Sequence, residues 1–150
     1  MNPISIAEAT AADTESVVGL LDAQLREHDI ATAEDALRAV VHAITSDARH
    51  GFFLLASKGA RSVGVAYAAA HLSAEHGGVV GWLEELYVVP DCRAQGIGSL
   101  LLDELMLRAL QLRWRAIELE IVAGHERAAA LYLRHGFVAL HRTRYTKILS

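Results

Sequence analysis

Two glycines and an arginine lie together in the segment RAQGIGSLLL, which runs from Arg93 to Leu102. Gly96 and Gly98 fall between a run that is typical of a strand and a leucine-rich run that is typical of a helix. The first N–H groups of a helix have no partner inside it and, with the macrodipole, carry about half a positive charge. Because glycine has no Cβ, an anion can approach this backbone closely, and Arg93 adds a positive charge. The segment therefore predicts either a phosphate or pyrophosphate site or an ordinary strand-to-helix turn that needs glycine.

Two other kinds of phosphate-binding loop do not fit this spacing. The dinucleotide-binding fingerprint requires a third glycine where Leu101 stands, and no lysine follows Gly98 as a P-loop would require. A dehydrogenase and a nucleotide triphosphatase are therefore disfavoured.

Two adjacent glutamates, Glu84 and Glu85, precede the glycine segment in the run VVGWLEELYVV. Carboxylates that lead into an anion-binding loop are candidates for proton transfer. Neighbouring residues of a strand face opposite sides, so normally only one of the two can reach a site. The alternative is that both are solvent-facing residues of a sheet.

The whole chain has the size and composition of one folded domain, which we place at residues 1–150. It is 53% hydrophobic and 21% charged, and no apolar run is long enough to span a bilayer. The N-terminus lacks the pattern of a signal peptide, and Cys92 is the only cysteine, so we expect a cytoplasmic protein without an intrachain disulfide. The eight histidines show no metal-ligand spacing, so we expect no metal.

Charge is unevenly distributed along the chain. Residues 1–50 hold nine acidic and three basic side chains, whereas residues 101–150 hold eight basic ones. The net charge of −4 argues against a general nucleic-acid binder, and we expect neither nucleic acid nor membrane as a partner. The asymmetry indicates either solvated faces, or an acidic end that attracts a cationic substrate and a basic end near an anionic cofactor.

The elements that would position these residues follow from periodicity and turn residues. Strands are expected at 4–9, 51–57, 61–72, 79–89 and 116–122, with one or two closing strands in 137–149. Helices are expected from Asp13 to about Leu25, and at about 33–46, 97–112 and 125–135. The order is β-α-α-β-β-β-α-β-α-β, which predicts an α/β fold.

The motifs VVPDCRAQGIGSLLL and AALYLRHGF together resemble the GNAT family of N-acetyltransferases. In the second motif the matching residues are Ala128, Leu131, Tyr132, Gly136 and Phe137. Within the family, WLEELYVVPDCRAQGIG is similar to the small-amine acetyltransferases of the diamine and thialysine type. The resemblance implies a mixed, mainly antiparallel sheet flanked by helices, with acetyl-CoA as co-substrate.

The resemblance also implies which residues would contact acetyl-CoA. The backbone of Leu86, Tyr87 and Val88 would pair with the pantetheine arm like an added strand. The pyrophosphate would lie against the loop and helix start formed by Arg93, Ala94, Gln95, Gly96, Ile97, Gly98 and Ser99. His125 stands where the family often has an asparagine that contacts the cofactor. Ala94 replaces a usual glycine, which costs little if its backbone is not left-handed.

The catalytic residues implied by the resemblance are Glu84, Glu85 and Tyr132. Glu84 is expected to be the general base and Glu85 a partner for substrate charge, and the family usually has a β-bulge in this strand. The Tyr132 hydroxyl is expected to hydrogen-bond the departing thiolate and to donate its proton if the pocket raises the thiol pKa. The alternative is a core tyrosine, with Tyr87 or Tyr145 as the acid.

The predicted function is transfer of the acetyl group of acetyl-CoA directly to a primary amine, in a small molecule. A protein or peptide N-acetyltransferase and a non-catalytic CoA-binding regulatory module remain alternatives. The segment from Glu27 to Asp35 is expected to wall the substrate site. We also allow for a homodimer.

Overall fold

The computed structural model describes residues 2–150, in which it places five strands and four α-helices. The chain divides into two compact units, one up to Glu120 and one from Ile121 onward. The first unit holds the sheet and three helices, and the second holds helix α4 (Arg127–Arg134). Each unit is described by itself.

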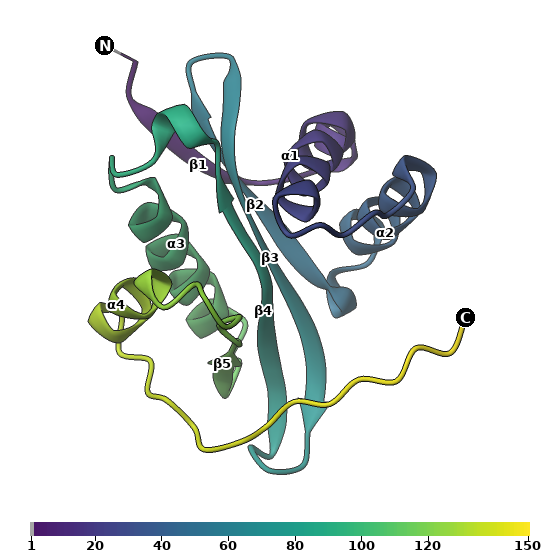
Figure 1. Ribbon diagram of the computed structural model, residues 1–150, viewed down its shortest axis with the longest axis vertical. Coiled ribbons are helices and arrows are strands. Elements are labelled where there is room, and N and C mark those ends of the chain that lie inside the picture. Colours follow the sequence, from purple (N-terminus) through teal and green to yellow (C-terminus); the bar gives the residue numbers. More distant parts are fainter. Residues whose placement is uncertain (1) are drawn as a thin grey trace. The chain divides into compact units, whose positions relative to one another are not determined.

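One mixed sheet organises the first unit, with its strands in chain order (Figure 1). The strands are β1 (Ile4–Glu8), β2 (Gly51–Lys58), β3 (Arg61–Ser73), β4 (Gly78–Val88) and β5 (Ala116–Glu118). Antiparallel pairing joins β1 through β4, whereas β5 runs parallel to β4. The mainly antiparallel sheet flanked by helices confirms the predicted fold class.

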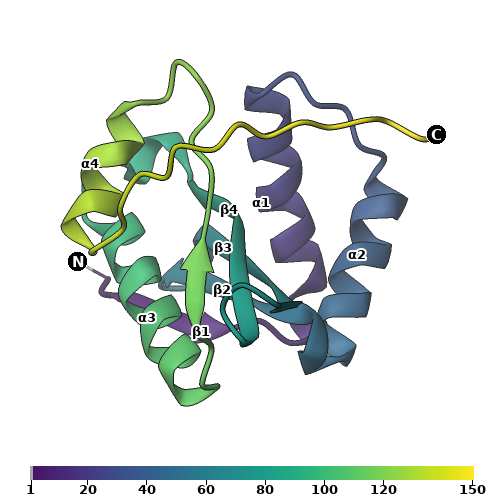
Figure 2. The same ribbon diagram turned by 90° about the horizontal axis from the view of Figure 1, so that it is seen from below.

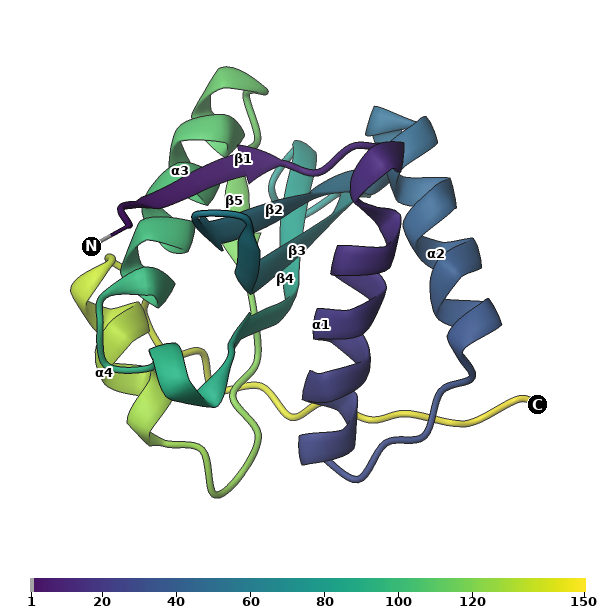
Figure 3. The same cartoon turned by 90° about the horizontal axis from the view of Figure 1, so that it is seen from above.

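Helices cover both faces of this sheet. Helices α1 (Thr14–Glu27) and α2 (Glu34–Ser46) lie on one face, and α3 (Ile97–Gln111) lies on the other (Figures 2 and 3). Side chains alternate between the faces of a strand, so every second residue meets the same layer. The cluster under α1 and α2 takes its sheet residues from three strands, namely Phe53, Leu55, Val65, Tyr67 and Tyr87.

A close approach fixes the start of β5 beside β4. The Trp114 ring lies directly over Gly81, where an added Cβ would come within 2.3 Å of the ring. The same ring stacks on Phe52 at 5.4 Å between centroids. Gly81 pairs with Ile117 in the parallel ladder, so only a residue without a side chain fits between the indole and this pairing.

Two expected strands differ from what the structure shows. The strand expected at 116–122 is assigned only over Ala116–Glu118, and residues 137–150 contain no strand. The apolar side chains of that tail are largely exposed, for example Val138 and Leu149. A strand needs a partner for its N–H and C=O groups, and local propensity does not supply one.

Among residues 2–150, no helix combines the length and the apolar character that crossing a membrane would require.

Candidate active site

A β-bulge interrupts β4 at Glu84. Tyr67 of β3 pairs with Glu85, but the next residue, Ala68, pairs with Leu83, so Glu84 is an extra residue that the register between the two strands skips. A bulge turns the extra side chain out of strict alternation. Neighbouring glutamates can therefore act on one side of the sheet, which an undistorted strand would prevent.

Glu85 is the half-buried member of the pair, and Glu84 is exposed. By alternation Glu85 faces the same side as Tyr87, which packs in the cluster under α1. Burial, followed by the negative charge of Glu84, raises the pKa of Glu85 to about 7. A carboxyl group with such a pKa can exchange a proton near neutral pH.

Tyr67, the cross-strand partner of Glu85, is a second group whose pKa the charge of Glu84 influences. Burial, followed by the negative charge of Glu84, raises the pKa of Tyr67 to about 12. One exposed carboxylate thus influences both Glu85 and Tyr67, which are cross-strand partners. Tyr67 remains a neutral hydrogen-bond donor throughout the physiological range.

The outer edge of β4 lacks a strand partner over its second half. Strand β5 pairs only with Val80, Gly81 and Trp82, and within the described chain no strand pairs with this edge from Leu83 onward. Two carbonyl groups beyond this point accept side-chain hydrogen bonds. Leu86 O accepts from Gln24 Nε2 at 3.4 Å, and Val88 O accepts from Arg93 Nε at 2.8 Å.

Arg93 is held against α1 by several interactions. Its Nη2 lies 2.9 and 3.0 Å from the two carboxylate oxygens of Glu27, and its guanidinium lies 5.5 Å from the centre of the Tyr87 ring. Burial raises the pKa of Glu27, but hydrogen bonds from Arg93 and Tyr87 outweigh it, and the net pKa is lowered. Tyr87 shows the opposite shift, because burial and then Glu27 raise its pKa. Arg93 thereby connects the glycine loop to the C-terminal end of α1.

The loop between β4 and α3 has the geometry of an anion-binding helix start. Gly96 is the N-cap residue with φ of 80°, and the first helical bond runs from Leu100 N to Gly96 O. The N–H groups of Ile97, Gly98 and Ser99 therefore precede the first intrahelical bond. The first turn contains no acidic side chain, so its positive end is not neutralised from within the helix. Gln95, also in the loop, donates from Nε2 to Asp91 O at 3.3 Å.

Ala94 has a left-handed backbone, with φ of 62°. The expectation that alanine costs little here depended on a conformation that it does not adopt. For a residue with a Cβ this region costs about 1–2 kcal/mol. Ala94 therefore introduces local strain into the loop directly after Arg93.

The second unit carries the remaining predicted site residues. Tyr132 is half-buried on α4, its ring meets Phe137 edge to face at 5.7 Å, and burial raises its pKa. His125 precedes the helix, and its carbonyl oxygen accepts a bond from Ala128 N. Gly136 has φ of 87° and ends the helix as predicted. The catalytic role of Tyr132 and the cofactor contact of His125 stay predictions, as does the alternative role of the exposed Tyr145.

The negative charge of the segment from Glu27 to Asp35 is partly neutralised by Arg38. Arg38 pairs with Glu34 and Asp35 on its own helix and with Glu15 of α1. Cationic attraction would therefore depend less on these residues than on the glutamates of β4. Asp29, in the turn after α1, has a left-handed backbone with φ of 56°.

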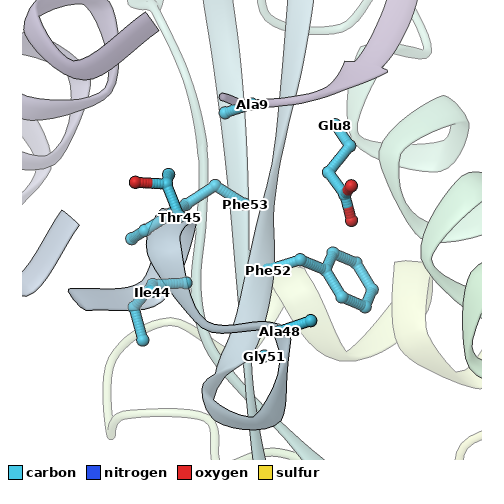
Figure 4. A pocket seen from close by; sticks show the side chains of 8 residues that line it. All are labelled: Glu8, Ala9, Ile44, Thr45, Ala48, Gly51, Phe52 and Phe53. Atoms are coloured by element: carbon cyan, nitrogen blue, oxygen red, sulfur yellow. The ribbon is translucent and has the colours of Figure 1, made fainter. Parts of the chain in front are cut away.

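A small hollow elsewhere in the first unit is unrelated to this arrangement. Its volume is about 60 Å³, and it lies between β1, β2 and the end of α2 (Figure 4). None of the predicted site residues lines it. Cys92 is buried as well, and within residues 2–150 no group of His, Cys, Asp and Glu side chains could hold a metal ion.

Sequence reasoning missed Gln24 and Tyr67. Gln24 occupies the face of α1 that also carries Val17, Leu20 and Leu21, and it is the polar exception on this buried face. A polar residue within an apolar helix face can be recognised from the sequence alone, so Gln24 could have been identified as a candidate. Tyr67 had no signal in the sequence, because its relation to the glutamates depends on the register of β3 and β4.

Several solved structures have the same fold. An integron cassette protein from the mobile metagenome of Cole Harbour Salt Marsh matches with a TM-score of 0.87 and 25% identity, over 97% of this chain and 90% of that one. The aminoglycoside N-acetyltransferase AAC(6')-Iy, solved with CoA, matches with a TM-score of 0.85 and 18% identity, over 99% and 96%. A predicted acetyltransferase from Clostridium acetobutylicum, solved with acetyl-CoA, matches with a TM-score of 0.81 and 17% identity, over 97% and 96%.

Comparisons of the amino-acid sequence identify a family but no individual curated relative. A search of curated proteins finds no match. The family model for the acetyltransferase (GNAT) domain, however, matches residues 49–139, which is more than half of the chain and spans β2 through α4. This chain therefore belongs to the GNAT family of acetyltransferases and is an enzyme of that family.

Proposed function

We propose that this enzyme transfers the acetyl group of acetyl-CoA directly to a primary amine of a small cationic molecule, with residues 1–150 acting as one catalytic domain. The observation that carries the proposal is the carboxyl group of Glu85, whose pKa of about 7 arises from burial and from the neighbouring Glu84. It lies on the bulged half of β4, next to the edge that β5 leaves unpaired.

The acetyl donor would bind along this edge and at the start of α3. The backbone at Leu86 to Val88 offers an extended segment to which the pantetheine arm can add as a strand does. The three N–H groups from Ile97 to Ser99 and the guanidinium of Arg93 would hold the pyrophosphate. Acetyl-CoA supplies an activated thioester whose carbonyl carbon accepts a nucleophile.

Proton removal from the acceptor is the main task of the protein. An alkyl ammonium group with a pKa near 10.4 is neutral in only about one molecule in 10³ at pH 7. We assign Glu85 as the base, because it is half-buried, and Glu84 as the group that attracts the cation. This assignment reverses the one that the family resemblance implied. Transfer to a carboxylate of pKa about 7 is uphill by about 4–5 kcal/mol, which is accessible within an enzymatic barrier.

The remaining steps conserve atoms and charge. The neutral amine nitrogen bonds to the thioester carbonyl carbon, the carbon–sulfur bond breaks, and the sulfur leaves as a thiolate. The second ammonium proton passes to solvent as the amide forms, and the thiolate takes up a proton from solvent to become free CoA. We assign the Tyr132 hydroxyl as a hydrogen-bond donor to the thiolate, since its raised pKa makes complete proton transfer less favourable than hydrogen bonding.

The acceptor class can be tested with one panel of amines. Among the structural neighbours, one acetylates an aminoglycoside and another is named a ribosomal-protein-alanine N-acetyltransferase, so the panel contains both chemistries. Release of free CoA would be measured with 1,4-diaminobutane, spermidine, kanamycin and a peptide with N-terminal alanine. We expect turnover with a small polycation and little with the peptide.

The outcomes separate the competing functions. Preference for the peptide would replace the small-molecule acceptor with a protein acceptor. Calorimetric binding of acetyl-CoA without CoA release from any amine would instead indicate a regulatory module. Analytical ultracentrifugation of the same preparation would test whether the enzyme forms a homodimer.

A further inference from the structure

The side chain of Gln24 is a buried amide in an otherwise apolar layer. It is 8% exposed, on the face of α1 that meets the sheet. Burial of a polar group is unfavourable unless its hydrogen-bonding atoms find partners. Nε2 donates to Leu86 O, but Oε1 has no hydrogen-bond partner. The amide is therefore satisfied on one side only.

The orientation of this amide follows from its neighbour. Rotating the amide by half a turn would place Oε1 against Leu86 O, and two acceptor oxygens repel each other. The contact with Leu86 O thus holds Nε2 on the strand and leaves Oε1 as a buried acceptor without a hydrogen-bond partner. What the unpaired oxygen requires is a group that donates a hydrogen bond.

The position of Gln24 indicates which donor would reach it. Its partner Leu86 lies directly after Glu85, on the half of β4 that β5 leaves unpaired. Three residues further along α1, on the same side of the helix, Glu27 holds Arg93. Gln24 therefore lies between the carboxylates of β4 and the ion pair at the loop that we assign to the acetyl donor.

We propose that Gln24 Oε1 accepts a hydrogen bond from an N–H of the acceptor amine and so holds the amine nitrogen beside the carboxylate of Glu85. The inference rests on the proposed function and adds to it an acceptor-binding residue on α1. A primary ammonium group carries three donors, so one can meet Glu85 while another meets Gln24. Loss of a single proton to Glu85 leaves the second hydrogen bond intact, which keeps the nitrogen oriented during attack.

The test uses two variants of Gln24 that both lack the amide donor and differ in whether they retain an acceptor oxygen. Gln24→Met has similar length but neither donor nor acceptor, whereas Gln24→Glu lacks the amide donor and retains acceptor oxygens. We expect Gln24→Met to raise KM for the preferred amine at least tenfold, with KM for acetyl-CoA within twofold of the unmodified enzyme. Gln24→Glu should keep KM for the amine within about threefold. Gln111→Met, an exposed glutamine at the end of α3, is the matched control.

A purely structural role predicts a different pattern. If Gln24 served only to hold Leu86 O, both variants would lose the donor and would be impaired alike, with lower thermal stability. That result, or an unchanged amine KM in Gln24→Met, overturns the inference and leaves the proposed function standing. The pH dependence of kcat/KM should keep its limb near 7 in Gln24→Met, because Glu85 is untouched. If no amine in the panel is acetylated, the proposed function fails and the inference fails with it.

Discussion

The two halves of β4 differ in almost every structural respect. From Gly78 to Leu83 the strand pairs with β3 on one edge, and at Val80 to Trp82 it also pairs with β5 on the other. From Glu84 to Val88 it contains a bulge, lacks a strand on its outer edge, and carries the half-buried carboxyl group. The first half has strand partners on both edges over Val80 to Trp82, whereas the second half pairs with β3 alone and has no strand on its outer edge. Departures from regular structure thus concentrate where we place the chemistry.

Removal of the carboxylate in the second half should have the largest effect. Glu85→Gln keeps the shape of the side chain but cannot accept the amine proton, so kcat should fall by about 10²–10⁴-fold. In the unmodified enzyme kcat/KM should fall as pH falls below about 7, because Glu85 becomes protonated and can no longer accept a proton. This fall is the acidic limb of the pH profile. Steady-state rates between pH 5.5 and 9.5 should show that this limb is absent in the variant. A retained limb would assign the base to Glu84.

The same substitution should separate activity from stability. The pKa of Glu85 is higher in the folded protein, about 7, than its usual 4.5, so folding is most favourable while the group is protonated and loses stability as pH rises from about 4.5 to 7. The loss is at most about 3–4 kcal/mol, at about 1.36 kcal/mol per pKa unit, and solvent screening of the partly exposed carboxylate reduces it below this bound. Glu85→Gln avoids this loss and should be more stable than the unmodified enzyme at pH 8 and similar to it at pH 4. Urea unfolding at both pH values measures the difference, and equal stability at pH 8 would contradict the raised pKa.

A change in the first half should affect stability rather than chemistry. In Gly81→Ala the new methyl group would meet the Trp114 ring, so the ring or the parallel pairing must shift. Overpacking of this kind costs about 1–3 kcal/mol. Thermal unfolding should show the loss, while KM for acetyl-CoA below the melting range stays within about twofold. Gly19→Ala, on helix α1 where an added Cβ meets nothing within 4 Å and φ is not positive, controls for the general effect of replacing glycine. A KM for acetyl-CoA that rises more than twofold while the melting temperature stays unchanged would contradict the distinction between the two halves.

The smallest expected effect concerns the loop that follows the second half. Ala94→Gly relieves a left-handed backbone, worth about 1–2 kcal/mol, and adds about 0.4–1 kcal/mol of unfolded-chain entropy. The net result should be a stabilisation of about 0.5–1 kcal/mol, seen as a small rise in melting temperature. A lower melting temperature would mean that the alanine methyl group makes a compensating contact.

The glycine loop and the helices were predictable from the sequence because their signals are local. The start of α3 at Ile97 and its end near Leu112 follow from a glycine pair and an apolar run. The hairpin between β2 and β3 and the left-handed Gly136 after α4 follow from the same kind of evidence. Turn chemistry and helical periodicity are properties of neighbouring residues, so no tertiary contact is needed to read them.

The roles within the candidate site were decided by the tertiary structure. Which of Glu84 and Glu85 is buried depends on the register between β3 and β4, and a bulge of one residue changes it. The partner of Gln24 is 62 residues away in the chain, and the left-handed backbone of Ala94 appears only once the loop is closed. The tail at 137–149 had the composition of strands, but pairing is a property of two segments. The sequence by itself determined the family motifs and the order of the elements, because these depend on spacing. Burial, register and hydrogen-bond partners required the folded chain, because they depend on residues that are distant in sequence.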